Sequence, residues 1–149
     1  MESGSMRRDD CVFCKIINGE FPSRTLYETD KFKVILDIAP VTKGHALIMP
    51  KEHFENLYEL PDEVAAEAMI LAKSIAIELK DRLHADGMNI IQNNGEVADQ
   101  TVPHYHLHVI PRYEHEVGIF NWGHKSPSVE ELDAIQQEIL GADSTSITL

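Results

Sequence analysis

Cysteine is scarce in this chain, and no apolar run is long enough to cross a bilayer. The two cysteines, Cys11 and Cys14, form one C-x-x-C pair. In a reducing compartment such a pair is more often half of a metal site or a redox pair than a structural disulfide. The first residues, 1–5, are polar and precede a second methionine, Met6. They indicate an appended leader and not a signal peptide, so we expect a cytoplasmic protein that spans no membrane.

Basic residues are also few. Lys and Arg together number 13 against 25 Asp and Glu, which gives a net charge of -12. This balance excludes a broad basic surface for the backbone of a long nucleic acid. It leaves room for a single phosphate, because distant surface charges are screened within roughly 8 Å at cellular salt. Local imidazoles and backbone N–H groups would then decide whether an anion binds.

The length of 149 residues suits one domain whose core needs no disulfides. We predict a single α+β domain over residues 11–141, with a leader or disordered N-terminus at 1–10 and a flexible tail at 142–149. The fold would be about five mostly antiparallel strands packed with one long helix and a C-terminal helix. Patterning predicts strands at 23–29, 32–38, 45–50, 88–93 and 104–110, a helical stretch at 11–18 and a loop at 112–127.

The long helix is predicted at residues 62–85, where apolar residues recur every three or four positions. Its stripe consists of Val64, Ala68, Leu71, Ile75, Leu79 and Leu83. The C-terminal helix begins at Ser128, which forms a capping box with Glu131. Its stripe consists of Val129, Leu132, Ile135 and Ile139.

The segment 102–110, VPHYHLHVI, carries a histidine at every second position. Side chains of a strand alternate between its two faces. One side would carry His104, His106 and His108, and the core-facing side would carry Tyr105, Leu107 and Val109. Neighbouring rings would stand about 6.8 Å apart along the strand and could line a groove of nucleotide-phosphate size. We therefore expect the histidine side to face a cleft or solvent.

Three imidazoles on one side have two functional interpretations. They could hold a catalytic Zn²⁺ that keeps an open position. Alternatively, one neutral ring is a nucleophile, and its neighbours stabilise a phosphate and protonate the leaving group. The loop at 93–101, NNGEVADQT, precedes the triad and offers amide, hydroxyl and backbone N–H groups suited to phosphate contacts. A three-histidine metal site would not need such groups, so the loop favours the second interpretation.

The sequence resembles the histidine-triad (HIT) family, whose motif is His-φ-His-φ-His-φ-φ with φ apolar. The corresponding segment here is HYHLHVI at 104–110. Three further segments, CVFCKIINGEFPS, DIAPVTKGHALIMPKEHF and NNGEVADQT, fall in the family's order and spacing. The resemblance therefore covers residues 11–112, and the layout is similar to bacterial members of the Hint-like branch.

The resemblance implies a homodimer of α+β subunits that binds nucleotide on the sheet beside the triad. Members of this kind cleave the P–N bond, or a related P–O bond, of purine nucleoside phosphoramidates. They work through a nucleotidyl-histidine intermediate and release AMP or GMP. Three alternatives stay open: a dinucleoside polyphosphate hydrolase, a nucleotide-binding regulatory protein with incidental hydrolysis, and a metal-dependent hydrolase.

By position, the resemblance makes His106 the nucleophile. The rest of the catalytic set would be His108 at the reacting phosphate, His45 across the site, and His104. The substrate-binding residues would be Val12, Phe13 and Ile16 at the base, Asp37 at the ribose, and Asn93, Gln100, Thr101 and His108 near the phosphate and leaving group. Structural interpretations also stand, with Asp37 and Asn93 as turn residues, His45 as a polar strand-end residue, and Phe13 and Ile16 as core.

One residue departs from this branch. Asp99 stands where glycine is common, and a carboxylate near the phosphate would be unfavourable unless it points away.

The two cysteines recur in bacterial relatives that carry a structural zinc ion. The resemblance implies that Cys11, Cys14, His53 and His104 form a closed Cys₂His₂ site here. Such a site would remove His104 from direct chemistry and stiffen the start of the triad strand, and the chemistry itself would need no cofactor. The alternative makes both cysteines small reduced hydrophobes and His53 a surface residue.

Overall fold

The structure is a computed structural model that describes residues 8–116 and 123–149. The chain forms two compact units, Met1–Val117 and Gly118–Leu149. Most of the predicted leader, residues 1–7, lies outside the described residues, as does the stretch 117–122 of the predicted loop.

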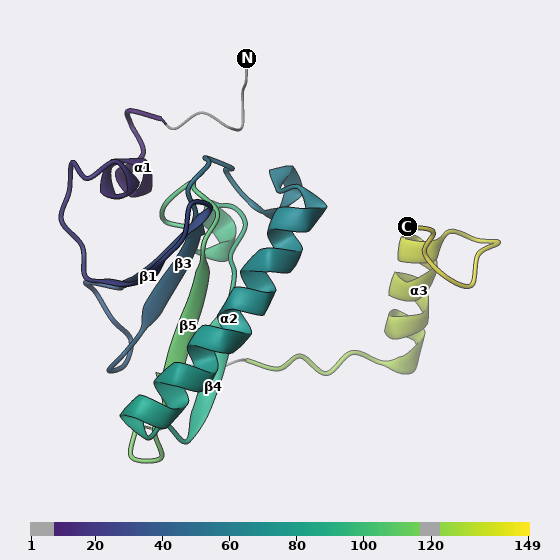
Figure 1. Cartoon of the computed structure of the whole chain (residues 1–149). Helices are drawn as coiled ribbons and strands as arrows, with labels where there is room; N and C mark the ends of the chain where they lie inside the picture. Colours follow the sequence, from purple (N-terminus) through teal and green to yellow (C-terminus); the bar gives the residue numbers. More distant parts are fainter. Residues whose placement is uncertain (1–7, 117–122) are drawn as a thin grey trace. The chain divides into compact units, whose positions relative to one another are not determined.

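One five-stranded sheet organises the first unit, and every strand pair in it is antiparallel (Figure 1). The strand order is β1-β2-β3-β5-β4. The strands are β1 (Thr25–Glu28), β2 (Phe32–Leu36), β3 (Ala46–Pro50), β4 (Gly87–Ile91) and β5 (Leu107–Arg112). The helices are α1 (Val12–Ile17), α2 (Asp62–Leu83) and α3 (Val129–Leu140), with two 3₁₀ turns, η1 (Leu57–Glu59) and η2 (Glu96–Ala98). The predicted α+β fold is confirmed.

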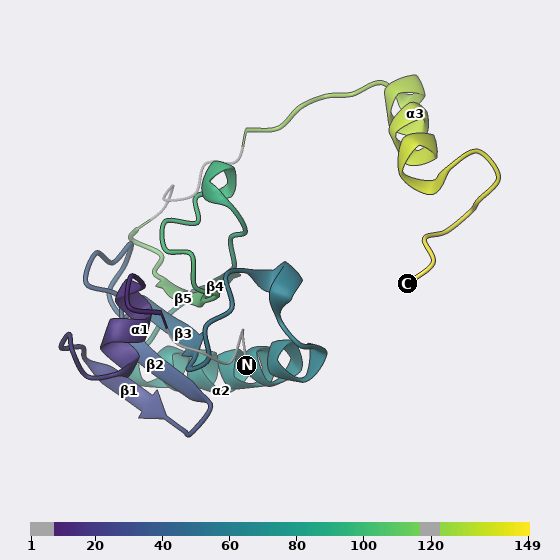
Figure 2. The same ribbon diagram turned by 90° about the horizontal axis from the view of Figure 1, so that it is seen from above.

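The central strands β2 and β3 carry apolar side chains on both faces, and both faces are covered. On one face, Val34, Ile48 and Val109 are fully buried beneath α2 and form the larger core with Tyr105 and Leu107. On the other, Ile35, Leu47 and Met49 pack with α1 through a smaller cluster. Figure 2 shows the two helices on either side of the strands. The site residues lie on the α1 side, since His108 is paired with Leu47 across β3 and β5.

Helix α2 confirms the predicted stripe. Ala68, Ile75 and Leu79 are buried, while Val64, Leu71 and Leu83 are partly buried against the same core. The helix ends two residues before the predicted boundary, because His84 adopts a left-handed conformation (φ 56°) and breaks the helical repeat. None of the helices in the described part of the chain is long and apolar enough to span a membrane.

The triad strand begins later than predicted. The ladder of β5 starts at Leu107, so His104 and His106 precede it. The reason lies in the main chain, where the His104 N–H donates to the Val102 carbonyl and the Tyr105 N–H to the Phe54 carbonyl. Because their main-chain groups are used in these bonds, residues 104 and 105 do not pair with β3 or β4, and the sheet pairing of β5 starts at Leu107.

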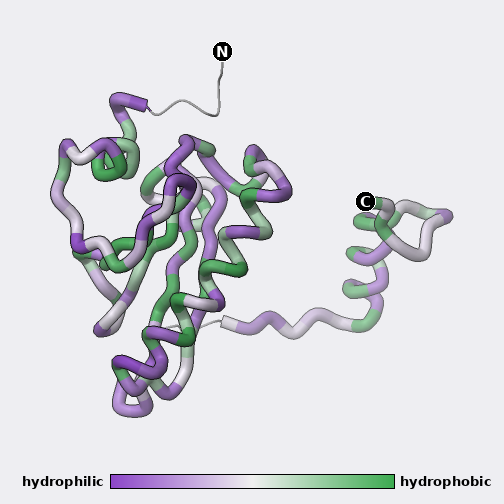
Figure 3. Tube along the Cα trace, in the orientation of Figure 1, coloured by the Kyte–Doolittle hydropathy of each residue, from purple (hydrophilic) through white to green (hydrophobic). Residues whose placement is uncertain are grey.

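The second unit holds α3, which begins at the predicted capping box of Ser128 and Glu131. Its apolar stripe forms as predicted, and Figure 3 shows apolar and polar residues alternating along it. The stripe side chains Val129, Leu132, Ile135 and Ile139 are all exposed. A 12-residue helix with an exposed stripe gains little from packing within its own unit.

Candidate active site and metal cluster

The structure divides the three triad histidines between two sites. The His106 and His108 rings lie together, with centroids 4.9 Å apart, and His45 lies beside His108 at 5.1 Å. The His104 ring lies instead among Cys11, Cys14 and His53. The expectation of one groove lined by three rings is therefore wrong. It assumed a regular strand through residue 104, whereas the ladder starts at Leu107.

The imidazoles are also more buried than expected for a solvent-facing side. His45, His104 and His106 are each at most 5% exposed, and His108 is partly buried. Burial disfavours the charged ring and lowers the pKa of all four histidines, to about 4 for His104 and His106. At neutral pH these rings are neutral, so each has one N–H donor and one lone pair.

Main-chain contacts determine which nitrogen of His106 carries the proton. Its Nδ1 lies 2.7 Å from the His104 carbonyl oxygen, which can only accept. Nδ1 therefore bears the hydrogen, and the lone pair sits on Nε2. A neutral imidazole with a free Nε2 lone pair is a nucleophile.

A second chain of hydrogen bonds fixes the opposite tautomer in His108. The Val41 N–H donates to His45 Nδ1 at 3.0 Å, which leaves the hydrogen of His45 on Nε2. That Nε2–H donates to His108 Nδ1 at 2.9 Å, so His108 carries its own hydrogen on Nε2. Asp37 Oδ2 lies 3.5 Å from His45 Nε2 and supports this orientation. The two neighbouring rings thus offer one lone pair, at His106, and one N–H donor, at His108.

Helix α1 places apolar side chains beside the nucleophile candidate. Phe13 is buried and meets the His106 ring edge-on, with centroids 4.9 Å apart. Ile16 packs partly buried against the same cluster, while Val12 is 38% exposed. Asp37 lies across the site, where its Oδ1 accepts the Ala39 N–H in a turn and its Oδ2 faces His45. The turn interpretation of Asp37 is therefore correct, and it leaves one carboxylate oxygen directed at the site.

The predicted phosphate loop folds around Gln100. Its side-chain oxygen accepts the Gly95 N–H at 2.8 Å, and its amide nitrogen donates to the Glu55 and Val102 carbonyls. All of these bonds go to the main chain, so Gln100 positions the loop. Its predicted contact with substrate, like those of Asn93 and Thr101, stays a prediction. Asn93 donates to the Asp99 carbonyl at 3.4 Å, and Thr101 is exposed.

Asp99 adopts a left-handed backbone conformation, with φ 67°. Glycine reaches this region without strain, and aspartate is among the residues that tolerate it best. The side chain is exposed. The backbone at position 99 would therefore accept glycine with less strain than aspartate.

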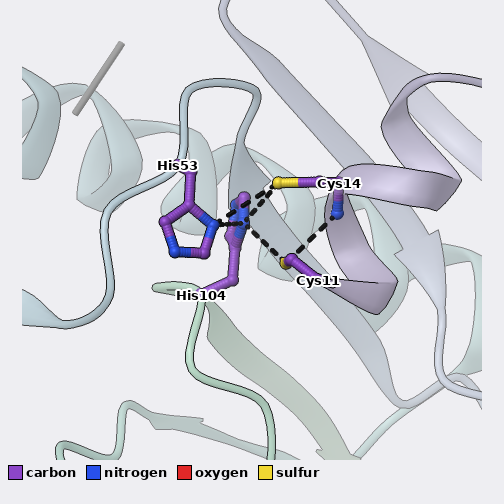
Figure 4. Close-up of side chains that lie close together, drawn as sticks. All are labelled: Cys11, Cys14, His53 and His104. Atoms are coloured by element: carbon purple, nitrogen blue, oxygen red, sulfur yellow. Dashed lines mark hydrogen bonds between the residues drawn. The ribbon is translucent and has the colours of Figure 1, made fainter. Parts of the chain in front are cut away.

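The second site is a buried cluster of Cys11, Cys14, His53 and His104 (Figure 4). His104 Nδ1 lies 3.4 Å from Cys11 Sγ, 3.6 Å from Cys14 Sγ and 3.2 Å from His53 Nδ1. Zinc–ligand bonds of ordinary length predict tetrahedral edges of about 3.3 Å between two nitrogens and about 3.6 Å between nitrogen and sulfur. The observed separations match these edges, so the cluster could hold a metal ion. His53 is 5% exposed, and its interpretation as a surface residue is wrong.

The hydrogen-bond pattern also fits a metal at this cluster. The His104 Nε2–H donates to the Pro50 carbonyl at 2.8 Å, which leaves the Nδ1 lone pair for an ion. A second group, Asp37, His45 and His108, also has its potential ligand atoms within 4.8 Å of one another. There the Val41 N–H occupies the lone pair of His45 Nδ1, so the ring must keep its hydrogen on Nε2. That group is better suited to a hydrogen-bond relay than to a metal.

Sequence reasoning missed the groups that orient the histidines. These are main-chain atoms, the Val41 N–H and the Pro50 and His104 carbonyls. Every residue has such groups, so no residue-type pattern marks them.

A buried imidazole with a lone pair on Nε2, beside an imidazole N–H donor on an antiparallel α+β sheet, is typical of the histidine-triad hydrolases. The chain belongs to the HIT domain family, whose model matches residues 18–115, and it is an enzyme of the hydrolase class. The adenosine 5'-monophosphoramidase of Saccharomyces cerevisiae is 41% identical over 131 residues, 87% of this chain and 80% of that protein.

Two solved structures are also similar. A HIT family member from Bacillus subtilis has a TM-score of 0.78 and 40% identity, covering 93% of this chain and all of that one. A zinc-bound histidine triad protein from Mycobacterium smegmatis has a TM-score of 0.69 and 38% identity, covering 87% of this chain and 95% of that one.

Proposed function

We propose that the protein cleaves the P–N bond of purine nucleoside phosphoramidates, or a related P–O bond, and releases AMP or GMP. The observation that carries this proposal is the pair of opposite tautomers. His106 presents an Nε2 lone pair and His108 presents an Nε2–H donor, with ring centroids 4.9 Å apart. A nucleophile beside a donor suits attack on a phosphorus whose oxygens need stabilisation and whose amine needs a proton.

In the first step, the lone pair of His106 Nε2 forms a bond to phosphorus while the P–N bond to the amine breaks. The departing amine takes the Nε2 proton of His108, the N–H donor beside the reacting phosphorus. The nucleotidyl-imidazole is cationic, and its Nδ1–H already donates to the His104 carbonyl. This short bond strengthens as the ring becomes charged, so it stabilises the intermediate more than the free enzyme.

In the second step, water attacks phosphorus and the P–N bond to His106 breaks. The water gives its proton to His108 Nε2, which replaces the hydrogen that the amine took, and the lone pair returns to His106 Nε2. The nucleoside monophosphate leaves, and His106 is again neutral with its hydrogen on Nδ1. No net charge accumulates on the enzyme over the cycle.

Substrate binding would use the predicted residues around this pair. Phe13, Ile16 and Val12 would form an apolar pocket for the base, and Asp37 Oδ2, which faces His45, would also accept a ribose hydroxyl. Asn93, Thr101 and His108 would approach the phosphate region from a loop that Gln100 positions. The cytoplasmic location stays a prediction.

The proposed reaction is tested by turnover of the zinc-loaded protein on two substrate types. We expect faster AMP release from adenosine 5'-phosphoramidate than from a dinucleoside polyphosphate, because His108 is a single donor suited to a small leaving group. The measurement is kcat/KM for each substrate by chromatography of released AMP. A preference for the polyphosphate would identify the alternative hydrolase. Tight AMP binding with no turnover on either would identify a binding protein.

We propose further that the four-residue cluster holds a structural zinc ion. Its thiolate and imidazole donors are the set that zinc prefers, and all four residues are buried, which suits a closed site. We expect protein purified without chelator to contain about one zinc per chain. Cys14→Ser should lower the content to a small fraction, while His115→Ala, an exposed histidine outside the cluster, should not change it. Elemental analysis decides this, and a trace content in the unsubstituted protein would contradict the proposal.

We also propose that two copies form a homodimer. Strand β4 lies at the sheet edge, and an unpaired edge is a site for association. Helix α2 exposes Met69, Ile70 and Ile77 on its outer side. We expect light scattering to give twice the mass of one chain, and Ile77→Glu to shift the population toward monomer. Val97→Glu, at a fully exposed position elsewhere, is the control. A single-chain mass for the unsubstituted protein at high concentration would contradict the dimer.

A further inference from the structure

One residue, His104, belongs to both sites. Its ring faces Cys11 Sγ at 3.4 Å and His53 Nδ1 at 3.2 Å. Its carbonyl oxygen lies 2.7 Å from His106 Nδ1 and accepts the hydrogen that leaves the Nε2 lone pair free. A shift of the His104 main chain therefore moves the acceptor on which the His106 tautomer depends.

A second contact joins the same two sites. Phe13 lies between the two cysteines in α1, and its ring meets His104 at 5.9 Å and His106 at 4.9 Å. Helix α1 has only six residues, too few to be stable by itself. Its first turn is capped by Cys11, whose sulfur accepts the Cys14 N–H. Whatever anchors the two cysteines therefore anchors Phe13 against the nucleophile.

A third connection runs through the segment that carries His53. The neighbouring Phe54 carbonyl accepts the Tyr105 N–H at 2.6 Å, and the Glu55 carbonyl accepts the Gln100 amide at 2.7 Å. Residues 102–106 precede the ladder of β5. They are held by these contacts and by the cluster, and not by pairing within the sheet.

We infer that metal occupancy of the Cys11, Cys14, His53 and His104 cluster governs turnover, because it fixes the His104 carbonyl that orients the His106 imidazole. His104 is thus a positioning residue that acts through His106. The predicted change in turnover rests on the proposed function, whereas the predicted orientation of the His106 ring rests on the structure alone.

The larger core should survive loss of the metal. It lies on the other face of the sheet, under α2, and none of the four cluster residues belongs to it. Metal removal should therefore loosen α1 and the main chain at His104 without unfolding the protein, because Tyr105 stays anchored in the larger core. A freed His106 ring would place its hydrogen on either nitrogen, and the form with hydrogen on Nε2 has no lone pair for attack. Because outer contacts of this kind usually change activity 10- to 100-fold, we expect kcat to fall by roughly that factor.

The test compares zinc-loaded, chelated and zinc-restored protein in which histidine is labelled with ¹⁵N. Two-bond ¹H–¹⁵N correlation spectra report the tautomer of each ring, and His106→Ala identifies the signals of His106. We expect hydrogen on Nδ1 in the loaded protein, a mixed tautomer after chelation, and recovery when zinc returns. kcat should follow the same cycle. The Kd for AMP should rise as well, because the proposed base pocket lies on α1, while Asp37 and His45, which flank β2 and β3, should keep their contact.

His53→Ala keeps the other three ligands and weakens metal binding, so occupancy can be titrated in folded protein even if full chelation unfolds it. Turnover and the fraction of His106 with hydrogen on Nδ1 should rise together with bound zinc, and His115→Ala should behave as the unsubstituted protein. An unchanged His106 tautomer between empty and loaded protein overturns the inference, as does absence of metal binding. A tautomer that follows the metal in protein inert on every phosphoramidate upholds the inference and overturns the proposed function.

Discussion

His106→Ala should reduce AMP release from adenosine 5'-phosphoramidate by roughly a thousandfold or more, because it removes the atom that bonds to phosphorus. Nucleotide binding should survive, since the groups expected to hold base and ribose lie on α1 and next to β2. The Kd for AMP should therefore change by only a few fold. Single-turnover assays with labelled substrate would also show loss of the covalent nucleotidyl intermediate.

The matched control is His115→Ala, which removes a histidine whose side chain is 76% exposed and lies outside both sites. Because His106 is 5% exposed, its truncation also opens a cavity, and urea unfolding should accompany the assay. A folded His106→Ala protein that retains turnover would contradict the nucleophile assignment. Equal losses in His106→Ala and His115→Ala would point to a general effect on folding.

Gly44→Ala should destabilise the protein by about 2–4 kcal/mol, the largest effect we expect from a single methyl group. Gly44 has φ 90°, which alanine adopts only with strain. An added Cβ would also collide with the Leu83 side chain at the end of α2 and press on Pro111 in β5. Since Gly44 directly precedes His45, the displaced backbone should lower activity as well. Urea denaturation measures the free energy of unfolding.

Gly19→Ala separates the two causes. Gly19 has a similar φ of 84°, but nothing lies within 4 Å of the position its Cβ would take. Gly19→Ala should lower the free energy of unfolding by the backbone contribution alone, about 1 kcal/mol. The difference between the two variants measures the clash with Leu83. Equal destabilisation of both would mean that backbone strain alone explains the need for glycine at position 44.

The elements predicted best from the sequence are those with strong local periodicity. The stripe of α2 and the core positions Tyr105, Leu107 and Val109 follow from the helical and strand repeats, which depend on each residue's neighbours in the chain. The capping box of α3 is equally local. The start of β5 was misplaced because the hydrogen bonds that keep residues 104 and 105 out of the ladder involve Val102 and Phe54, and the second of these is a long-range contact.

The sequence by itself determined the fold class, the family and the residues of both candidate sites, because these depend on residue types in a fixed order. The resemblance already implied that His104 joins the cysteines, and the tertiary structure places its ring there, away from the other two histidines. Only the tertiary structure decided which nitrogen of His106 and His108 carries hydrogen, through groups at positions 41, 45 and 104. The physical reason is that main-chain donors and acceptors are the same in every residue. Their effect on a side chain depends on where the fold places them, which no residue pattern records.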